Sequence, residues 1–316
     1  MRILVVTPAP RGSRKGNRVT AERWARLLRE LGHRVTVLDR YDDEPADLLL
    51  ALHARRSAAA VTRFAARHPD RHVVVALTGT DIYSDGKIDR IARRTLERAS
   101  RLVALQPLAL RRLEPRWRRK TRVILQSLPA PARRLPPRRG VFEIVVLGHL
   151  RAVKDPFLAA RAIRSLPDTS RIRLLQIGAA LSDSMANRAR TEMQRNPRYQ
   201  WLGELPRARA LALLSRSRLA VSTSKHEGGA NAVSEAIVCG TPVLATRIDG
   251  SVGLLGTRYP GLFPRGDVVE LTRLMVRCER DPAFLGRLAA ACRLLAPQFR
   301  PLRELKAWRE LLLELE

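Results

Sequence analysis

The most informative stretch of the chain begins at Ser224 and reads Ser224-Lys225-His226-Glu227-Gly228-Gly229-Ala230-Asn231-Ala232-Val233-Ser234-Glu235-Ala236-Ile237-Val238-Cys239-Gly240-Thr241-Pro242-Val243. Before it, Leu219-Ala220-Val221 is a short apolar run of the kind that forms a buried parallel strand. The two glycines allow a tight turn without a Cβ penalty. A helix is expected from about Asn231, with Asn231 as its N-cap.

The same stretch also marks where this helix ends. Gly240-Thr241-Pro242 stops it before the next apolar run, Val243-Leu244-Ala245. The predicted unit is therefore strand, glycine turn, helix, strand, as in α/β proteins with parallel sheets.

A helix that is entered through glycines presents unpaired N–H groups and the positive end of its dipole, so phosphate or diphosphate is the natural ligand. Two carboxylates, Glu227 and Glu235, accompany this helix start. Carboxylates repel phosphates but accept hydrogen bonds from neutral hydroxyls. A nucleotide sugar offers both kinds of group.

The stretch resembles the signature of the retaining, family 4 type of nucleotide-sugar glycosyltransferases. The residues in register with that signature are Glu227, Gly228, Asn231, Glu235, Ala236, Gly240, Pro242 and Val243. The departure is Gly229-Ala230, where that family usually has an aromatic residue and a proline or glycine. The alternative is that the two glutamates are a chance pair on a solvated helix face.

The resemblance implies a role for each signature residue. Glu227 would contact hydroxyls of the donor sugar and act as a catalytic residue, and Glu235 would hold the ribose. The helix start would bind the rest of the donor through Gly228, Gly229, Ala230, Asn231 and Ala232.

A second cluster follows the apolar run 142–147 and reads Gly148-His149-Leu150-Arg151-Ala152-Val153-Lys154-Asp155-Pro156. It resembles a family segment whose lysine binds the donor diphosphate, which implies donor contacts at Gly148 and a catalytic cation at Lys154, because the leaving nucleotide gains negative charge. The family's arginine is replaced by His149, which its position makes a candidate catalytic residue although a histidine is mostly neutral at pH 7 and lacks a bidentate fork. Arg151 is the candidate for the missing charge, and a surface lysine is the alternative for Lys154.

The N-terminal part opens like a Rossmann fold, with a strand over 2–7, an amphipathic helix over 18–31 and a second strand over 35–38. The loop between the first two, residues 8–18, is cationic and does not match Gly-x-Gly-x-x-Gly. The resemblance places it near the acceptor, which its charge predicts to be an anion. The implied acceptor residues are Arg14, Lys15, Gly16, Asn17 and Arg18; a solvated loop is the alternative.

A further strand is expected over 73–77, before Thr78-Gly79-Thr80-Asp81. The family often has a histidine where Thr78 stands, so an acid/base role at that position is in doubt. Thr80 and Asp81 are further candidates for acceptor binding, and a turn or N-cap role is the alternative for Asp81.

The formal net charge of +29 suggests polyanion binding, but the basic residues are spread along the chain. Lysine occurs at six positions only, so nearly all of the 59 basic residues are arginine, which favours coding bias over selection for nucleic acid. No aromatic residues alternate with the basic ones to stack bases. We expect no specific nucleic-acid partner.

Other features bound the class of protein. The three cysteines, Cys239, Cys278 and Cys292, form no Cys-x-x-Cys pair, so they are expected to be packing residues. No Asp-x-Asp occurs, and neither a metal nor a cofactor is expected. No apolar run reaches the roughly 20 residues that span a bilayer, and the N-terminus leads straight into a strand, so we expect a cytoplasmic protein without a transmembrane segment.

A proline-rich, charged segment over 128–140 has the composition of an interdomain linker. With 316 residues the chain is long enough for two α/β domains. The resemblance implies the GT-B fold: two facing Rossmann-like domains, residues 1–138 on the acceptor side and 139–298 for the nucleotide sugar. Residues 299–316 would form a helix that packs back on the first domain.

Several strings look like a narrower group, the selenosugar synthases of selenoneine biosynthesis. They are the opening Thr-Pro-Ala-Pro, the string Thr78 to Tyr83 and the cluster from Gly148 to Pro156. The resemblance implies a UDP-sugar donor, UDP-N-acetylglucosamine, and selenophosphate as the nucleophile, giving a C–Se bond. The alternatives are transfer of a hexose to a hydroxyl of a lipid or glycan, and a non-catalytic protein that binds nucleotide sugars or polyanions.

Overall fold

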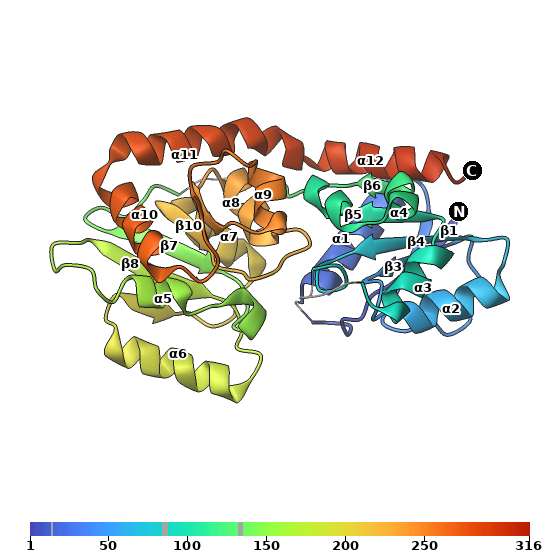
Figure 1. Cartoon of the computed structure of the whole chain (residues 1–316), viewed down its shortest axis with the longest axis horizontal. Coiled ribbons are helices and arrows are strands. Elements are labelled where there is room, and N and C mark those ends of the chain that lie inside the picture. Colours follow the sequence, from blue (N-terminus) through green and yellow to red (C-terminus); the bar gives the residue numbers. More distant parts are fainter. Residues whose placement is uncertain (14, 84–87, 132–134) are drawn as a thin grey trace. The chain divides into compact units, whose positions relative to one another are not determined.

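The computed structural model describes residues 1–13, 15–83, 88–131 and 135–316. The chain folds as two compact units (Figure 1). The first comprises Met1–Ser127, Glu227–Gly229 and Pro301–Glu316, and the second comprises Leu128–His226 and Ala230–Arg300.

The first unit contains a six-stranded parallel sheet in the order β2-β1-β3-β4-β5-β6. Its strands are β1 (Arg2–Val6), β2 (Arg34–Leu38), β3 (Leu48–Leu52), β4 (His72–Leu77), β5 (Arg101–Ala104) and β6 (Thr121–Val123). Its helices are α1 (Gly16–Glu30), α2 (Ala58–Arg67), α3 (Arg90–Arg98), η1 (Pro107–Arg112), α4 (Pro115–Arg119) and α12 (Pro301–Leu313).

Helices cover both faces of this sheet, which is why its central strands are apolar without alternation. Side chains of α2, α3 and α4, among them Phe64, Leu96 and Trp117, pack on one face. Those of α1 and α12, among them Trp24 and Trp308, pack on the other.

The second unit repeats the plan with the sheet order β12-β11-β10-β7-β8-β9, again parallel. The strands are β7 (Phe142–Leu147), β8 (Ile172–Ile177), β9 (Tyr199–Trp201), β10 (Leu219–Ser222), β11 (Val243–Thr246) and β12 (Leu262–Phe263). The helices are η2 (Ala152–Lys154), α5 (Leu158–Ala162), α6 (Asp183–Arg195), α7 (Arg207–Arg216), α8 (Asn231–Cys239), α9 (Asp249–Leu255), α10 (Val268–Arg280), α11 (Pro282–Leu295) and η3 (Ala296–Phe299).

The two Rossmann-like halves expected from the sequence are confirmed, and the three cysteines are buried and free. Within the described residues, no helix is long and apolar enough to cross a bilayer.

Two helix starts differ from the sequence prediction. Helix α1 begins at Gly16 and not at Arg18, because Lys15 is the extended residue that caps it. Ala230, and not Asn231, is the N-cap of α8, and its carbonyl accepts from Val233 N and Ser234 N. Helix α5 is short and begins only at Leu158, because Asp155 is left-handed and the chain turns through Phe157 first.

A buried carboxylate holds α12 to the first unit. Glu304 Oε1 accepts from Trp24 Nε1 at 2.7 Å, and its Oε2 accepts from Ser127 N at the same distance. The Arg23 guanidinium lies 3.6 Å away, and the rings of Trp24 and Trp308 meet edge to face with centroids 4.9 Å apart. The network ties the last residue before the second unit to the helix that follows that unit.

Replacing Glu304 with Ala is expected to lower the free energy of unfolding by about 3 kcal/mol, because buried donors and the Arg23 charge lose their partner. Urea denaturation followed by tryptophan fluorescence measures this directly. The matched control is Glu310→Ala on the same helix, whose carboxylate is exposed and 3.7 Å from Lys306; a change below about 0.5 kcal/mol is expected there. Equal effects of the two substitutions would contradict a structural role for the network.

Candidate active site

The second unit has its topological switch point between β10 and β7, where the chain connections run to opposite sides of the sheet. In open α/β sheets, ligands bind beyond the carboxyl ends of the strands at such a point. A small pocket lies there, at the ends of β7, β8 and β10 and against the first turn of α8. Its lining residues are Val146, Leu147, Gly148, Lys154, Pro156, Gln176, Val221, Ser222, Thr223, Ser224 and Ala232.

Two hydrogen bonds fix Lys154 at this pocket. Thr223 Oγ1 donates to the carbonyl oxygen of Lys154 at 2.8 Å, and Lys225 N donates to the carbonyl oxygen of Val153 at 2.8 Å. Both bonds join the segment after β10 to the segment after β7. The backbone of the half-buried Lys154 is thereby held at the pocket, and its contact with a donor diphosphate stays a prediction.

His149 is oriented by the backbone of a neighbouring loop. Ala179 N donates to His149 Nδ1 at 3.1 Å, so the neutral ring carries its proton on Nε2. Arg151, the other candidate for the missing arginine, is exposed and is the N-cap of η2.

This edge of the sheet depends on a close approach of two backbones. A Cβ atom at Gly178 would lie 2.2 Å from the carbonyl oxygen of Gly148 and 2.7 Å from His149 N. Gly178 also has φ +148°, which side chains rarely adopt. Only glycine at position 178 allows the segment with Gly148 and His149 to lie this close.

Helix α8 presents its first amides without a side-chain cap, and Ala232 in its first turn lines the pocket. Glu235 lies on the same helix, is 9% exposed, and its Oε1 is 2.9 Å from Arg207 Nη2 at the start of α7. The sequence predicted Glu235 for the ribose but gave no sign of Arg207. One arginine among so many at a helix start carries no signal in a single sequence.

The signature segment itself is divided. The half-buried Glu227 and the two glycines after it group with the first unit, whereas Ala230 and α8 group with the second. Within the first unit, a Cβ at Gly228 would lie 2.4 Å from the backbone of Thr78. The contact explains why a glycine stands at this position.

The proposed acceptor loop is shorter than expected, because Gly16, Asn17 and Arg18 form the first turn of α1. Arg18 is 4% exposed, and its Nε donates to Glu22 Oε1 at 2.9 Å, so it is no solvated loop cation. Lys15 is exposed at the helix start. Arg14 lies outside the described residues.

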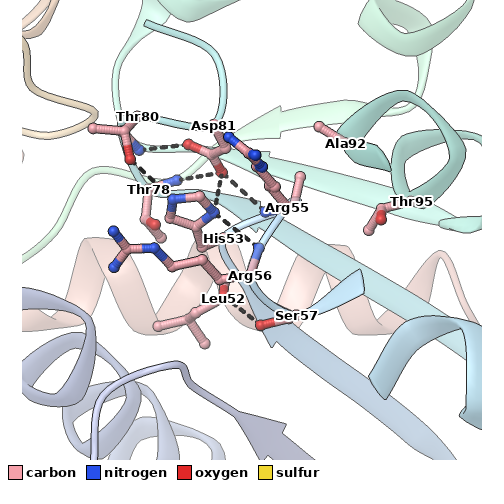
Figure 2. Close-up of polar contacts among 12 residues, drawn as sticks. Leu52, His53, Arg55, Arg56, Ser57, Thr78, Thr80, Asp81, Ala92 and Thr95 are labelled. Carbon is pink, nitrogen blue, oxygen red and sulfur yellow. Dashed lines mark hydrogen bonds and ion pairs between the residues drawn. The ribbon is translucent and has the colours of Figure 1, made fainter. Parts of the chain in front are cut away.

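The turn after β4 is built around Asp81 (Figure 2). Its buried carboxylate accepts from Gly79 N at 2.7 Å, from Ala54 N at 3.0 Å and from Thr78 N at 3.2 Å. These bonds give Asp81 the turn role that the sequence left open. Thr80, by contrast, is exposed.

Figure 2 also shows a residue that the sequence analysis missed. His53 follows β3 directly, is 4% exposed, and its Nε2 lies 3.0 Å from Thr80 Oγ1. The available signal was its position: a polar residue at the carboxyl end of the apolar run 48–52 is where α/β proteins place functional side chains.

The part of the chain that forms this pocket matches a known protein family in sequence. Residues 133–291 match the family model described as glycosyl transferases group 1. The chain belongs to this family. Its matched region contains the whole pocket, together with Lys154, Glu227 and Glu235.

Two curated relatives are similar over part of the chain. The 2-deoxystreptamine glucosyltransferase of Streptomyces kanamyceticus is 29% identical over 182 residues, which is 55% of this chain and 47% of the relative. The 2-deoxystreptamine N-acetyl-D-glucosaminyltransferase of Streptomyces fradiae is 36% identical over 77 residues, 24% of this chain and 18% of the relative. The chain thus matches about half or less of the length of either relative.

A solved structure is similar over the full length. The crystal structure of Anabaena HepE in complex with UDP-glucose has a TM-score of 0.81 at 17% identity, with 100% of both chains covered. Together with the two parallel sheets, this likeness shows the GT-B fold that the sequence predicted.

Replacing Gly178 with Ala is expected to lower the free energy of unfolding by about 2 kcal/mol, because the new methyl overlaps the Gly148 carbonyl and the segment must move. Chemical denaturation measures the loss. Gly286→Ala in α11 is the control, since a Cβ there meets no atom within 4 Å; helix propensity predicts a neutral or slightly stabilising effect. A neutral result at both positions would show that the Gly148 segment shifts at no cost.

Proposed function

We propose that this protein is a glycosyltransferase that takes its sugar from a UDP-sugar, with UDP-N-acetylglucosamine as the first candidate. The observation that carries the proposal is that Lys154 and the start of α8, which has no side-chain cap, meet at one switch-point pocket, with Glu235 further along the same helix. The relatives named as a glucosyltransferase and an N-acetyl-D-glucosaminyltransferase, and the UDP-glucose complex of HepE, support the same donor class.

The residues have distinct roles in this proposal. Lys154, His149 Nε2 and the amides of Asn231 and Ala232 bind the diphosphate and stabilise the charge that grows on UDP as the glycosidic bond breaks. Glu235 accepts hydrogen bonds from the ribose hydroxyls. When it does so, its ion pair with Arg207 either breaks or is kept alongside the new bonds. Glu227 accepts from the sugar hydroxyls.

For the acceptor we propose selenophosphate. Its selenium atom forms the new bond to the anomeric carbon, the bond from that carbon to UDP breaks, and UDP leaves with the electron pair. Water then cleaves the P–Se bond and releases phosphate from the selenosugar. A nucleophile that is already ionised needs no general base, which agrees with Thr78 standing where the family often has a histidine.

The proposal is tested by incubating the purified protein anaerobically with UDP-N-acetylglucosamine, with and without enzymatically generated selenophosphate. We expect UDP release that depends on selenophosphate and a product with the isotope pattern of selenium. UDP release with a lipid or glycan alcohol in its place would overturn the acceptor and favour O-glycosyl transfer. Binding of UDP without turnover of any UDP-sugar would favour a binding protein.

Two substitutions separate the roles of the carboxylates. Glu227→Ala is expected to reduce transfer at least 100-fold while UDP affinity stays within about twofold, because it removes contacts to the sugar only. Glu235→Ala is expected to weaken UDP binding at least tenfold, through loss of charge-assisted bonds to the ribose. Calorimetric titration with UDP and a UDP-release assay give both values.

Glu270→Ala is the control for this pair, because its carboxylate pairs with Arg273 on the outer side of α10. It should match the unsubstituted protein in both assays. Full activity of the Glu227 and Glu235 variants would refute the assignment of the signature.

A further inference from the structure

The first unit has a switch point of its own, between β1 and β3, which are neighbours in the sheet although β2 lies between them in the chain. By the same rule as in the second unit, a ligand is expected beyond the carboxyl ends of these strands. His53 follows β3, and the turn with Thr78, Thr80 and Asp81 follows the adjacent β4 (Figure 2).

The backbone of His53 is held in an unfavourable conformation. Its φ is +77°, in the left-handed region that costs a residue with a Cβ atom free energy, although histidine enters it more often than most. His53 N donates to the Ala76 carbonyl at 2.8 Å, and Ser57 N donates to the His53 carbonyl at 3.0 Å. Glycine would make this turn without strain. The presence of histidine in its place indicates that the imidazole side chain has a function here.

The contacts of the ring determine where its proton lies. Arg56 N donates to His53 Nδ1 at 3.3 Å, so Nδ1 uses its lone pair as an acceptor. The Asp81 carboxylate is 4.0 Å from Nδ1, too far for a hydrogen bond, and is already bonded to three backbone amides. Nε2 therefore carries the proton and donates to Thr80 Oγ1.

The ring is also kept neutral. Burial lowers the pKa of His53 below its ordinary value of 6.5; the nearby Arg56 and Arg55 lower it further, and Asp81 opposes them. Because the histidine is neutral at pH 7 with both nitrogens engaged, it has no lone pair left to accept a proton from a substrate.

The bond from the imidazole thereby determines in which direction the Thr80 hydroxyl can donate its own proton. Its oxygen accepts from the imidazole, so its own proton is left to donate to a group outside the turn, and Thr80 is exposed. Beside it, Thr78 Oγ1 makes no hydrogen bond to any described residue. Among the described residues 78–83 of this turn, the Thr80 hydroxyl is therefore the exposed donor, and the one carboxylate, that of Asp81, is already bonded to three backbone amides.

We propose that His53 is a positioning residue that fixes the Thr80 hydroxyl as a donor to an anionic oxygen of the acceptor, an oxyanion of the phosphate type. The inference rests on the proposed glycosyl transfer and adds which kind of acceptor substrate the site selects. This site recognises a substrate that is already ionised and whose oxygen atoms can accept hydrogen bonds. A neutral alcohol, which must lose a proton during transfer, finds among the described residues 78–83 no base that is not already bonded to the backbone.

The proton position is tested without any turnover. Long-range ¹H–¹⁵N spectra of the imidazoles, with His53 identified by its absence from His53→Gln, distinguish the two tautomers and the charged ring. We expect the Nε2–H form at pH 7 and a titration midpoint below 6.5. A charged ring or an Nδ1–H tautomer at pH 7 would overturn the inference.

The donor role is tested by kinetics with UDP-N-acetylglucosamine and selenophosphate. Thr80→Val keeps the shape and removes the hydroxyl, so the KM for selenophosphate should rise about tenfold while kcat and the KM for the donor stay within twofold. His53→Asn tolerates the left-handed backbone but cannot reach Thr80, and should behave like Thr80→Val. His53→Gln reaches Thr80 with its amide N–H, and should restore most of the affinity despite its poorer fit to the backbone.

A merely structural role predicts the reverse order of the two His53 variants, because asparagine suits the left-handed backbone better than glutamine does. Thr36→Val, on the exposed side of β2, is the matched control and should change neither constant. Unchanged KM values in Thr80→Val, or equal damage in His53→Gln and His53→Asn, would refute the proposal.

Calorimetric titration with inorganic thiophosphate, in the presence of UDP, separates this inference from the proposed function. Binding that weakens about tenfold in Thr80→Val and His53→Asn, but not in Thr36→Val, would support the anion site even if no UDP-sugar were turned over. Thiophosphate binding that is equal in all variants would refute the site even if transfer occurred.

Discussion

All strands of both sheets run parallel to their neighbours. Parallel strands are buried on both faces, so their interiors consist of apolar residues, and polar chemistry is confined to the segments beyond their ends. Because the carboxyl ends share one edge of each sheet, Lys154, Thr223 and the start of α8 meet in the second unit. By the same logic His53 meets Thr80 in the first.

The burial of parallel strands on both faces explains which features the sequence predicted well. The buried strands are uninterrupted apolar runs, so β7 over 142–147 was predicted with its observed bounds. The end of α8 was equally clear, since Gly240 adopts the left-handed conformation at its C-cap. Helix starts were less clear: the cap of α8 is Ala230, which uses its carbonyl and has no side-chain signal.

The site was predictable as far as it follows from local order. The switch-point pocket contains Gly148 and Lys154 from one short string of sequence and Ala232 from a second. Both strings had been singled out in the sequence. The pairing of Glu235 with Arg207 and the bond from His53 to Thr80 join segments about 27 residues apart, and depend on strand order and on one unusual backbone angle. A single sequence contains no periodicity from which such contacts could be read.

The placement of α12 has a consequence for how the protein is made. Residues 301–313 belong to the first unit, yet the ribosome synthesises them only after the entire second unit. Domains tend to fold in the order of their synthesis. Here the indole of Trp24, which α12 covers, stays uncovered while the second unit is synthesised. The first unit begins to fold first and is completed last, so its α12 face stays accessible to other chains and to chaperones in the interval.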